Sequence, residues 1–100
     1  MSRIYAVIRT RGGAWKDGVP VEQQYDFDGH MDYIRKLHGE GFIVYAGGLD
    51  NTNDALLIVR AEDEGEIKRK LEWDSWTAND LLRTIRVAPW TVRVGSLDPR

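Results

Sequence analysis

The chain contains no cysteine. This absence excludes disulfide bonds, thiol nucleophiles and thiolate-bound metals. The sequence also has no apolar run near the roughly 20 residues that a membrane-spanning helix needs. The start of the chain runs into a strand pattern and does not resemble a signal peptide. We therefore expect a cytoplasmic protein with no membrane partner.

A cluster of basic residues is also missing. The chain has 14 Lys and Arg against 16 Asp and Glu, with a net charge of −2, and its basic residues are spread along the whole length. A nucleic-acid-binding domain needs a basic patch or stripe to meet the phosphates. We therefore expect no DNA or RNA partner.

The common cofactor and hydrolase motifs are absent as well. The sequence has no GxGxxG, Walker A, GxSxG or HExxH pattern. His30 and His38 lie two helical turns apart, and no third neutral ligand is evident. We expect neither a cofactor nor a metal ion.

The composition is that of a folded globular domain. Of the 100 residues, 42% are hydrophobic and 30% are charged. This length fits a single domain. We assign the domain to residues 1–95 and expect a flexible tail at 96–100, with the sequence SLDPR.

The first half of the chain predicts a strand, a loop and a helix. Residues 3–10 alternate with a period of two, with Ile4, Ala6 and Ile8 on one face and Tyr5, Val7 and Arg9 on the other. Residues 11–25 are rich in glycine and have no period, which indicates a long loop. Residues 26–38 have helical period, with a cap at Asp26 or Asp28. The apolar stripe of this helix contains Phe27, Met31, Ile34 and Leu37.

The second half predicts three strands and a second helix. Residues 42–48 and 55–60 read as a hairpin. Residues 63–72 read as a helix with a capping box from Asp63 to Glu66. A further helical turn is expected at 77–82, and a strand at 83–94 with a bulge or edge position at Pro89.

The order of these elements is β-α-β-β-α-β, which is the ferredoxin-like pattern. It predicts an α+β fold with a four-stranded antiparallel sheet and two main helices on one face. The strands at 42–48 and 55–60 have apolar residues at both odd and even positions. We therefore expect both faces of the sheet to be covered. A second copy supplies that cover most simply, so we expect a homodimer through the open sheet face. The alternative is that these residues are ordinary exposed apolar ones.

His30 and Asp74 are the main candidates for chemistry. His30 lies beside the apolar stripe of the first helix and is expected to face the sheet, either as an acid–base group or as a hydrogen-bonded histidine at the edge of the core. Asp74 lies between two tryptophans. Partial desolvation would raise the pKa of Asp74 or make it seek a cationic partner, and the alternative role is a helix cap. His38 is expected to bond the last carbonyls of its helix.

Other side chains are candidates for binding. Arg9 and Arg11 can hold an anionic group, although solvated surface charge is the favoured interpretation. Trp15 and Tyr25 can close over a ring-shaped ligand or pin the loop to the body.

Three stretches resemble the YciI-like (YCII-related) family. They are the first strand with its Gly/Trp-containing loop, the segment DGHMDYIRKLHGEGFIVYAGGL at 28–49, and the segment KLEWDSWTANDLLRTIRVAPWTV at 70–92. The last two are similar to the family's helical histidine, its Ala-Gly-Pro strand end, its Asp-Pro-aromatic motif and its final Pro-Trp. The prolines of the two internal motifs are replaced here by Gly48 and Ser75.

The resemblance implies the dimeric α+β barrel fold and an active site that pairs His30 with Asp74. Asp74 would orient the imidazole and stabilise its protonated form, and His30 would move the proton. Residues expected on the pocket wall are Arg9, Trp15, Tyr25, Trp76 and Trp90.

Three functions follow as alternatives. The first is a cofactor-free lyase or isomerase acting on a small oxygenated cyclic compound, similar to a dehydrochlorinase or to muconolactone isomerase. The second is a non-catalytic ligand-binding or structural dimeric domain. The third is a cofactor-independent monooxygenase.

Overall fold

The computed structural model describes residues 2–96 of the chain. The expected tail therefore lies outside the described residues from position 97 onward. The elements, in chain order, are β1 (Arg3–Arg11), the 3-10 turn η1 (Val21–Gln23), α1 (Phe27–Gly39), β2 (Ile43–Gly48), β3 (Asp54–Ala61), α2 (Glu64–Glu72), α3 (Ser75–Ala78) and β4 (Leu82–Pro89).

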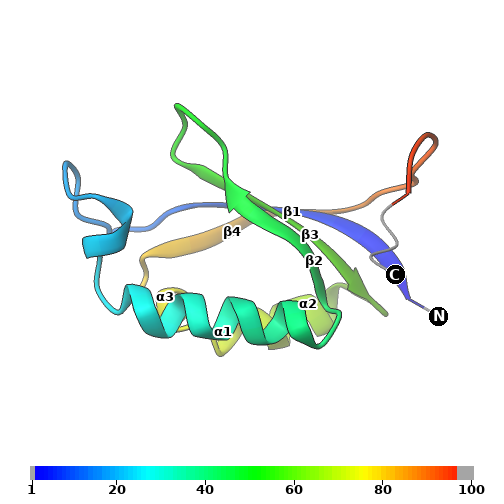
Figure 1. Cartoon of the computed structure of the whole chain (residues 1–100), viewed down its shortest axis with the longest axis horizontal. Coiled ribbons are helices and arrows are strands. Elements are labelled where there is room, and N and C mark those ends of the chain that lie inside the picture. The colour runs from blue at the N-terminus through cyan, green and yellow to red at the C-terminus, as the bar shows by residue number, and fades with distance from the viewer. Residues whose placement is uncertain (1, 97–100) are drawn as a thin grey trace.

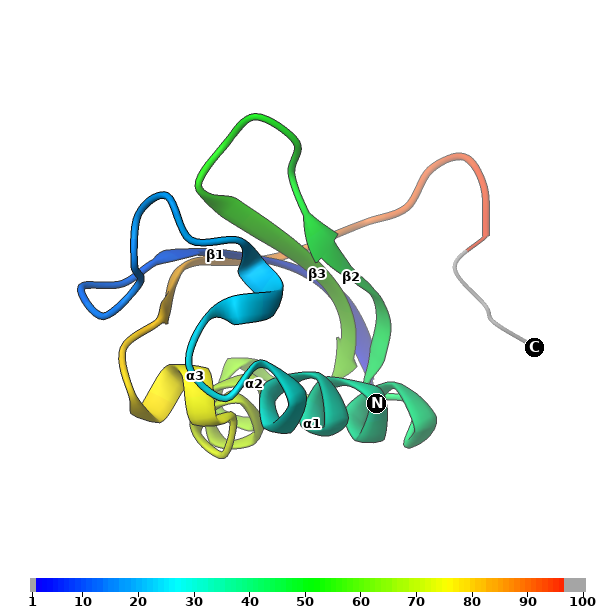
Figure 2. The same ribbon diagram turned by 60° about the vertical axis from the view of Figure 1, so that its left-hand side comes forward.

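The four strands form one antiparallel sheet in the order β2-β3-β1-β4. Helices α1, α2 and α3 lie on the same side of this sheet (Figures 1 and 2). The predicted α+β class and four-stranded antiparallel sheet are confirmed, and the arrangement is compatible with a ferredoxin-like fold. Within the described residues, no helix is both long and apolar enough to cross a membrane.

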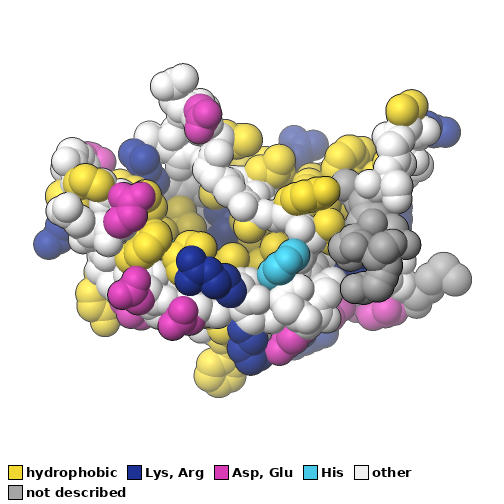
Figure 3. All heavy atoms as spheres, in the orientation of Figure 1, with side chains coloured by type: hydrophobic (Ala, Val, Ile, Leu, Met, Phe, Trp, Pro, Cys, Tyr) yellow, Lys and Arg dark blue, Asp and Glu magenta, His cyan; other side chains and the backbone are white. Residues whose placement is uncertain are grey.

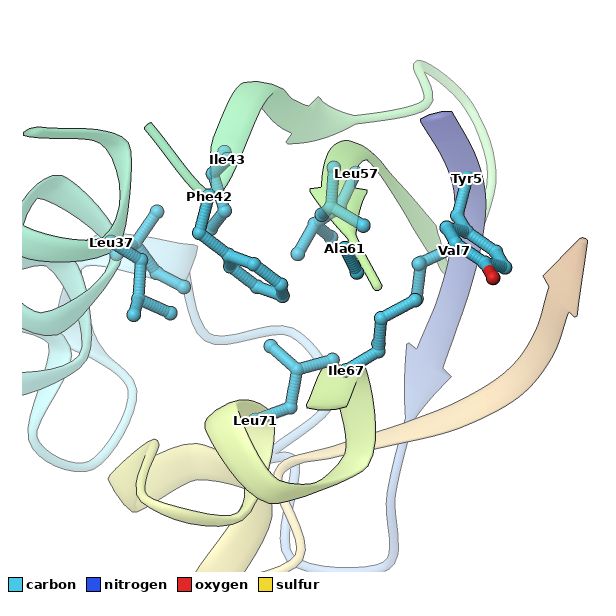
Figure 4. Packing of buried hydrophobic residues seen from close by; sticks show 11 residues of the cluster. Tyr5, Val7, Leu37, Phe42, Ile43, Leu57, Ala61, Ile67 and Leu71 are labelled. Atoms are coloured by element: carbon cyan, nitrogen blue, oxygen red, sulfur yellow. The ribbon is translucent and has the colours of Figure 1, made fainter. Parts of the chain in front are cut away.

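The core lies between the sheet and the helices (Figure 4). Strand β1 contributes Tyr5 and Val7, which the alternating pattern predicted to lie on the same face of the strand. Helix α1 contributes Ile34 and Leu37, and α2 contributes another pair of aliphatic side chains. Burial of these apolar surfaces, at about 25 cal/mol per Å², holds the helices on this face.

The other face of the sheet is also apolar. Ala6 of β1 pairs with Ala88 of β4, and Ile58 of β3 lies next to Ala6 on the same face. A shallow hollow on this face is lined by Ala6, Leu56, Ile58, Ala88, Pro89 and Trp90. No helix lies over this face in the described part of the chain (Figure 1).

The helix boundaries follow the expected signals in part. The Asp63 side chain accepts a hydrogen bond from the Glu66 N–H at 2.8 Å, as the capping pattern predicted. Gly41, which follows α1, has a φ of +84°, a conformation that glycine adopts without steric cost. At the other end of α1, Asp26 occupies the N-cap position, which is one of the two predicted residues. It adopts a left-handed conformation and its side chain makes no capping hydrogen bond, and Asp28 lies inside the helix.

The C-terminal part differs most from the prediction. The expected further helical turn is present, but its predicted bounds of 77–82 are wrong. Helix α3 starts at Ser75, where Asp74 caps it, and ends at Ala78, and Leu82 already belongs to β4. Strand β4 ends at Pro89, well before the expected residue 94. Of the two alternatives at Pro89, the edge position is confirmed, because β4 is an outer strand of the sheet. The bulge is not at Pro89. It lies near Ile85, where the register shifts opposite Ile8 and Arg9.

Candidate functional site

Asp74 lies in the short connection between α2 and α3 and is 0% exposed. Its Oδ1 accepts a hydrogen bond from the Trp76 N–H at 3.1 Å and so caps α3. The same oxygen is 2.8 Å from Nδ1 of His30 on α1. The cap and the histidine partner, which the sequence offered as alternatives, are both present on one carboxylate oxygen.

The second oxygen of Asp74 is held by Arg9 of β1. Nη1 of Arg9 donates to Oδ2 at 3.0 Å, and Nη2 donates to the Thr77 hydroxyl of α3. Arg9 is 1% exposed, so the interpretation as solvated surface charge is wrong. The sequence pattern did not show that Asp74 is the partner of Arg9. A buried guanidinium needs an opposite charge, and here the charge comes from a residue distant in the chain.

These contacts set the ionisation of Asp74. Burial raises the pKa of the carboxyl, but the hydrogen bond and charge of His30, the Arg9 guanidinium and the Trp76 N–H together hold the pKa below its ordinary value of 3.8. Of the two consequences expected from desolvation, the cationic partner is the one observed. Asp74 is therefore an ionised acceptor at neutral pH.

His30 lies on the buried stripe of α1, as predicted. Its ring stacks on the Trp76 indole with centroids 3.9 Å apart and an angle of 4° between the planes. Because Nδ1 donates to the Asp74 carboxylate, the lone pair of the neutral ring lies on Nε2. Nε2 has no hydrogen-bond partner among residues 2–96, and His30 lines a cavity. This geometry leaves one ring nitrogen free to accept or give a proton.

The cavity has a volume of about 430 Å³ and lies between α1, the sheet, the loop after β1 and the β2–β3 turn. Figure 3 shows hydrophobic side chains gathered in the hollow between α1 and the strands. Arg9, Trp15, His30 and Trp76 contribute to the lining, as expected from the sequence. Further apolar lining comes from Val21, Phe27, Met31, Ile34, Ala46, Leu57 and Leu82.

Two expected wall residues lie elsewhere. Tyr25 does not line the cavity: its side chain is 64% exposed, and its backbone carbonyl accepts a hydrogen bond from the Trp76 indole N–H. Trp90 lies beyond the end of β4 and lines the hollow on the opposite face of the sheet. Aromatic character alone does not indicate whether a side chain lines the cavity or lies elsewhere on the molecule.

The loop after β1 is held by a residue that the sequence interpretation missed. Gln24 is buried, accepts from the Lys16 N–H at 3.0 Å and donates to the carbonyls of Lys16 and Val19 at 2.8 and 2.9 Å. Trp15 meets Trp76 edge to face at 5.5 Å. The cavity wall is therefore built from a fixed loop. A buried glutamine that hydrogen-bonds the backbone of its own loop has no characteristic sequence spacing. No sequence pattern therefore indicated Gln24.

His38 is separate from this site. Its Nδ1 lies 2.8 Å from the carbonyl oxygen of Ile43 in β2, so it bonds the next strand and not the last helical carbonyls. Among the described residues, no group of three His, Cys, Asp or Glu side chains is placed to hold a metal ion. No protein-family model matches the chain, and no curated protein matches it. The interpretation of the site therefore rests on its geometry.

Proposed function

We propose that the protein is a cofactor-free lyase or isomerase that moves a proton on a small oxygenated cyclic compound. The observation that carries this proposal is the 2.8 Å contact between His30 Nδ1 and the buried Asp74 carboxylate, which leaves Nε2 free at a cavity. A histidine oriented by a carboxylate is a common general base. Simple ligand binding does not need such a pair.

The proposed chemistry starts with neutral His30. Its Nε2 takes a proton from a substrate carbon next to a carbonyl group. The electron pair of the C–H bond forms a C=C bond to the carbonyl carbon, and the carbonyl π pair moves to the oxygen to give an enolate. The imidazolium is stabilised by Asp74, which stays ionised. In an isomerase the proton returns at a different carbon, whereas in a lyase the electron pair expels a leaving group such as halide.

Two lines support this proposal. The pair named by the resemblance to the YciI-like family, His30 and Asp74, is also the pair whose side chains meet in the fold. Part of the lining is apolar and aromatic, with Trp15 and Trp76 suited to contact a flat ring. Membership of that family is part of the proposal.

We also propose that the protein forms a homodimer through the open sheet face. The support is the apolar hollow that includes Leu56, Ala88 and Trp90. A second copy of the same face would cover these side chains in a two-fold arrangement. This would give the paired sheets of a dimeric α+β barrel.

The test is a panel of cyclic enol-lactones, enolisable ring ketones and halogenated hydroquinones, incubated with the protein in D₂O under argon. Proton NMR follows deuterium incorporation and isomerisation, and an ion electrode follows halide release. We expect turnover by the native protein and a loss of about 100-fold or more in His30→Gln, the usual range for removal of a general base.

His38→Gln is the matched control, because it removes the other histidine, which does not line the cavity. It should keep full activity. Equal rates for His30→Gln and the native protein would contradict the proposal. Binding without turnover across the panel would favour a ligand-binding domain, and activity that requires added oxygen would favour a monooxygenase.

A further inference from the structure

Arg11 lines the same cavity as His30, but the proposed proton transfer does not use it. It is the last residue of β1 and lies two residues after Arg9, so both side chains project from the same face of the strand. Arg9 is neutralised by Asp74. Arg11 has no carboxylate within ion-pair distance in the described part of the chain, so its charge is not matched there.

Arg11 is nevertheless held in a defined position. Its Nη1 donates to Oδ1 of Asn53 at 3.0 Å, and its backbone N–H donates to the Asn53 carbonyl at 3.2 Å. Its guanidinium lies 4.5 Å from the centroid of the Trp15 ring. Neither Nε nor Nη2 has a partner among residues 2–96. These two donors form the planar edge with which arginine binds a carboxylate through two parallel hydrogen bonds.

An aromatic wall connects Arg11 to the proposed base. Trp15 contacts Arg11 on one side and Trp76 on the other, and Trp76 stacks on His30. Contacts between neighbouring side chains therefore link the cation to the imidazole, and all four residues line the cavity. A flat ring against this wall would present one end to each group.

Two acidic residues also belong to the lining, Asp50 and Asp54. Asp54 pairs with Thr10, so by register its side chain belongs to the face opposite Arg9 and Arg11. Asp50 is exposed in the β2–β3 turn. Arg11 therefore contacts the aromatic wall without a paired carboxylate among the described residues, and the two carboxylates in the lining disfavour a ligand with a second negative group.

We propose that the cavity takes a planar ring with one carboxylate, and that Arg11 binds this carboxylate. The proposal rests on the proposed function for the role of His30, and it adds the chemical class of the substrate. The apolar wall would hold the ring, and Arg11 would fix which end of the ring faces Nε2.

Calorimetric titration with benzoate, benzamide and benzamidine tests this proposal, because the three probes share one ring and differ in charge. We expect the native protein to bind benzoate at least about tenfold more tightly than benzamide, and benzamidine least. Arg11→Gln should reduce the benzoate preference to about twofold or less.

Two further variants sharpen the test. Asn53→Asp keeps the shape of the residue and places a carboxylate beside Arg11, so it should also remove the benzoate preference even if Arg11→Gln does not fold. Arg35→Gln makes the same change in net charge at an exposed position on α1 and should leave the preference unchanged.

Carboxylate binding by Arg11 can be tested separately from proton transfer by His30. His30→Gln should abolish turnover but keep the benzoate preference, since it leaves Arg11 and its contacts in place. A tenfold preference that persists in both Arg11→Gln and Asn53→Asp would overturn the inference. Equal binding of benzoate and benzamide to the native protein would overturn it too, without bearing on proton transfer by His30.

Discussion

At the scale of single residues, the site is organised around one carboxylate. Asp74 accepts from Arg9, His30 and the Trp76 backbone, so both of its oxygens are used. Each contact offsets part of the cost of burying the charge. The arrangement gives Arg9 a positioning role: it holds Asp74, and Asp74 holds the imidazole.

The first prediction concerns Arg9. Arg9→Met should lower the free energy of unfolding by about 3 kcal/mol, because the Asp74 charge stays buried with one cation fewer. Urea unfolding at neutral pH measures the change. The double variant Arg9→Met with Asp74→Asn should lose less than the sum of the two single variants. A loss below about 1 kcal/mol for Arg9→Met would show that the pair is weakly coupled.

The second prediction concerns pH. Because the folded protein holds the pKa of Asp74 below its unfolded value, the folded state binds fewer protons than the unfolded state as the solution is acidified. The stabilisation by Asp74 is complete at neutral pH and is lost as the pH falls through the folded pKa. The stability margin of the native protein over Asp74→Asn should therefore shrink between about pH 5 and about pH 2.

Asp80→Asn provides the comparison for this pH series. The hydrogen bond from Arg83 also lowers the pKa of Asp80, but that pair is exposed to solvent. The stability margin of the native protein over Asp80→Asn should be much smaller at neutral pH and should fall when salt is added. Thermal unfolding of the three proteins across the pH range gives the margins directly. A margin for Asp74→Asn that is constant with pH would contradict the assignment.

At the scale of elements, the end of β1 is joined to the turn between α3 and β4. The Gly12 N–H donates to the Leu81 carbonyl at 2.8 Å, and the Ala14 N–H donates to the Asp80 carbonyl at 3.0 Å. The backbones approach so closely that a Cβ on Gly12 would collide with the Asp80 carbonyl. This junction fixes where β1 ends, and hence where Arg9 and Arg11 lie.

A pair of glycine substitutions tests this junction. Gly12→Ala should destabilise the protein by about 2 kcal/mol, because backbone must move to relieve the collision. That corresponds to a fall in melting temperature of roughly 10 °C for a domain of this size. Gly39→Ala, at the end of α1 with open space around it, should be neutral or slightly stabilising. Equal melting temperatures for the two variants would contradict the close approach.

At the scale of the whole molecule, the sheet has one face that packs against helices and another that carries the hollow lined by Ala6 and Ala88. The proposed dimer makes a direct prediction for that second face. Ala88→Arg should convert a dimer into a folded monomer, because it places a charge in the centre of the apolar contact. Sedimentation velocity measures the mass, and circular dichroism checks the fold.

Trp73→Arg is the matched control for the dimer. It makes a similar change from an apolar to a charged side chain, but Trp73 is 80% exposed at the end of α2, on the helical side. This variant should stay dimeric. A native protein that sediments as a monomer at tens of micromolar would contradict the dimer proposal, while leaving the assignment of the proton-transfer site intact.

Local patterns in the sequence predict several features of the fold. Alternation placed Tyr5 and Val7 on the same face of the strand, although it did not indicate that this face is the core face, and helical period placed His30 beside Ile34 and Leu37. The capping spacing found the start of α2 at Asp63. These signals work because side-chain direction repeats with the period of the strand or the helix.

The pairing of the buried charges depends on the tertiary structure. Arg9 and Asp74 are 65 residues apart in the chain, and His30 and Asp74 are 44 apart. The alternation of β1 already placed Arg9 on the same face as Tyr5 and Val7, but burial of a charge depends on a partner that local pattern does not show. The positions of Tyr25 and Trp90 also depend on the tertiary structure. Tyr25 depends on how the loop after β1 closes, and Trp90 depends on where β4 stops pairing with β1.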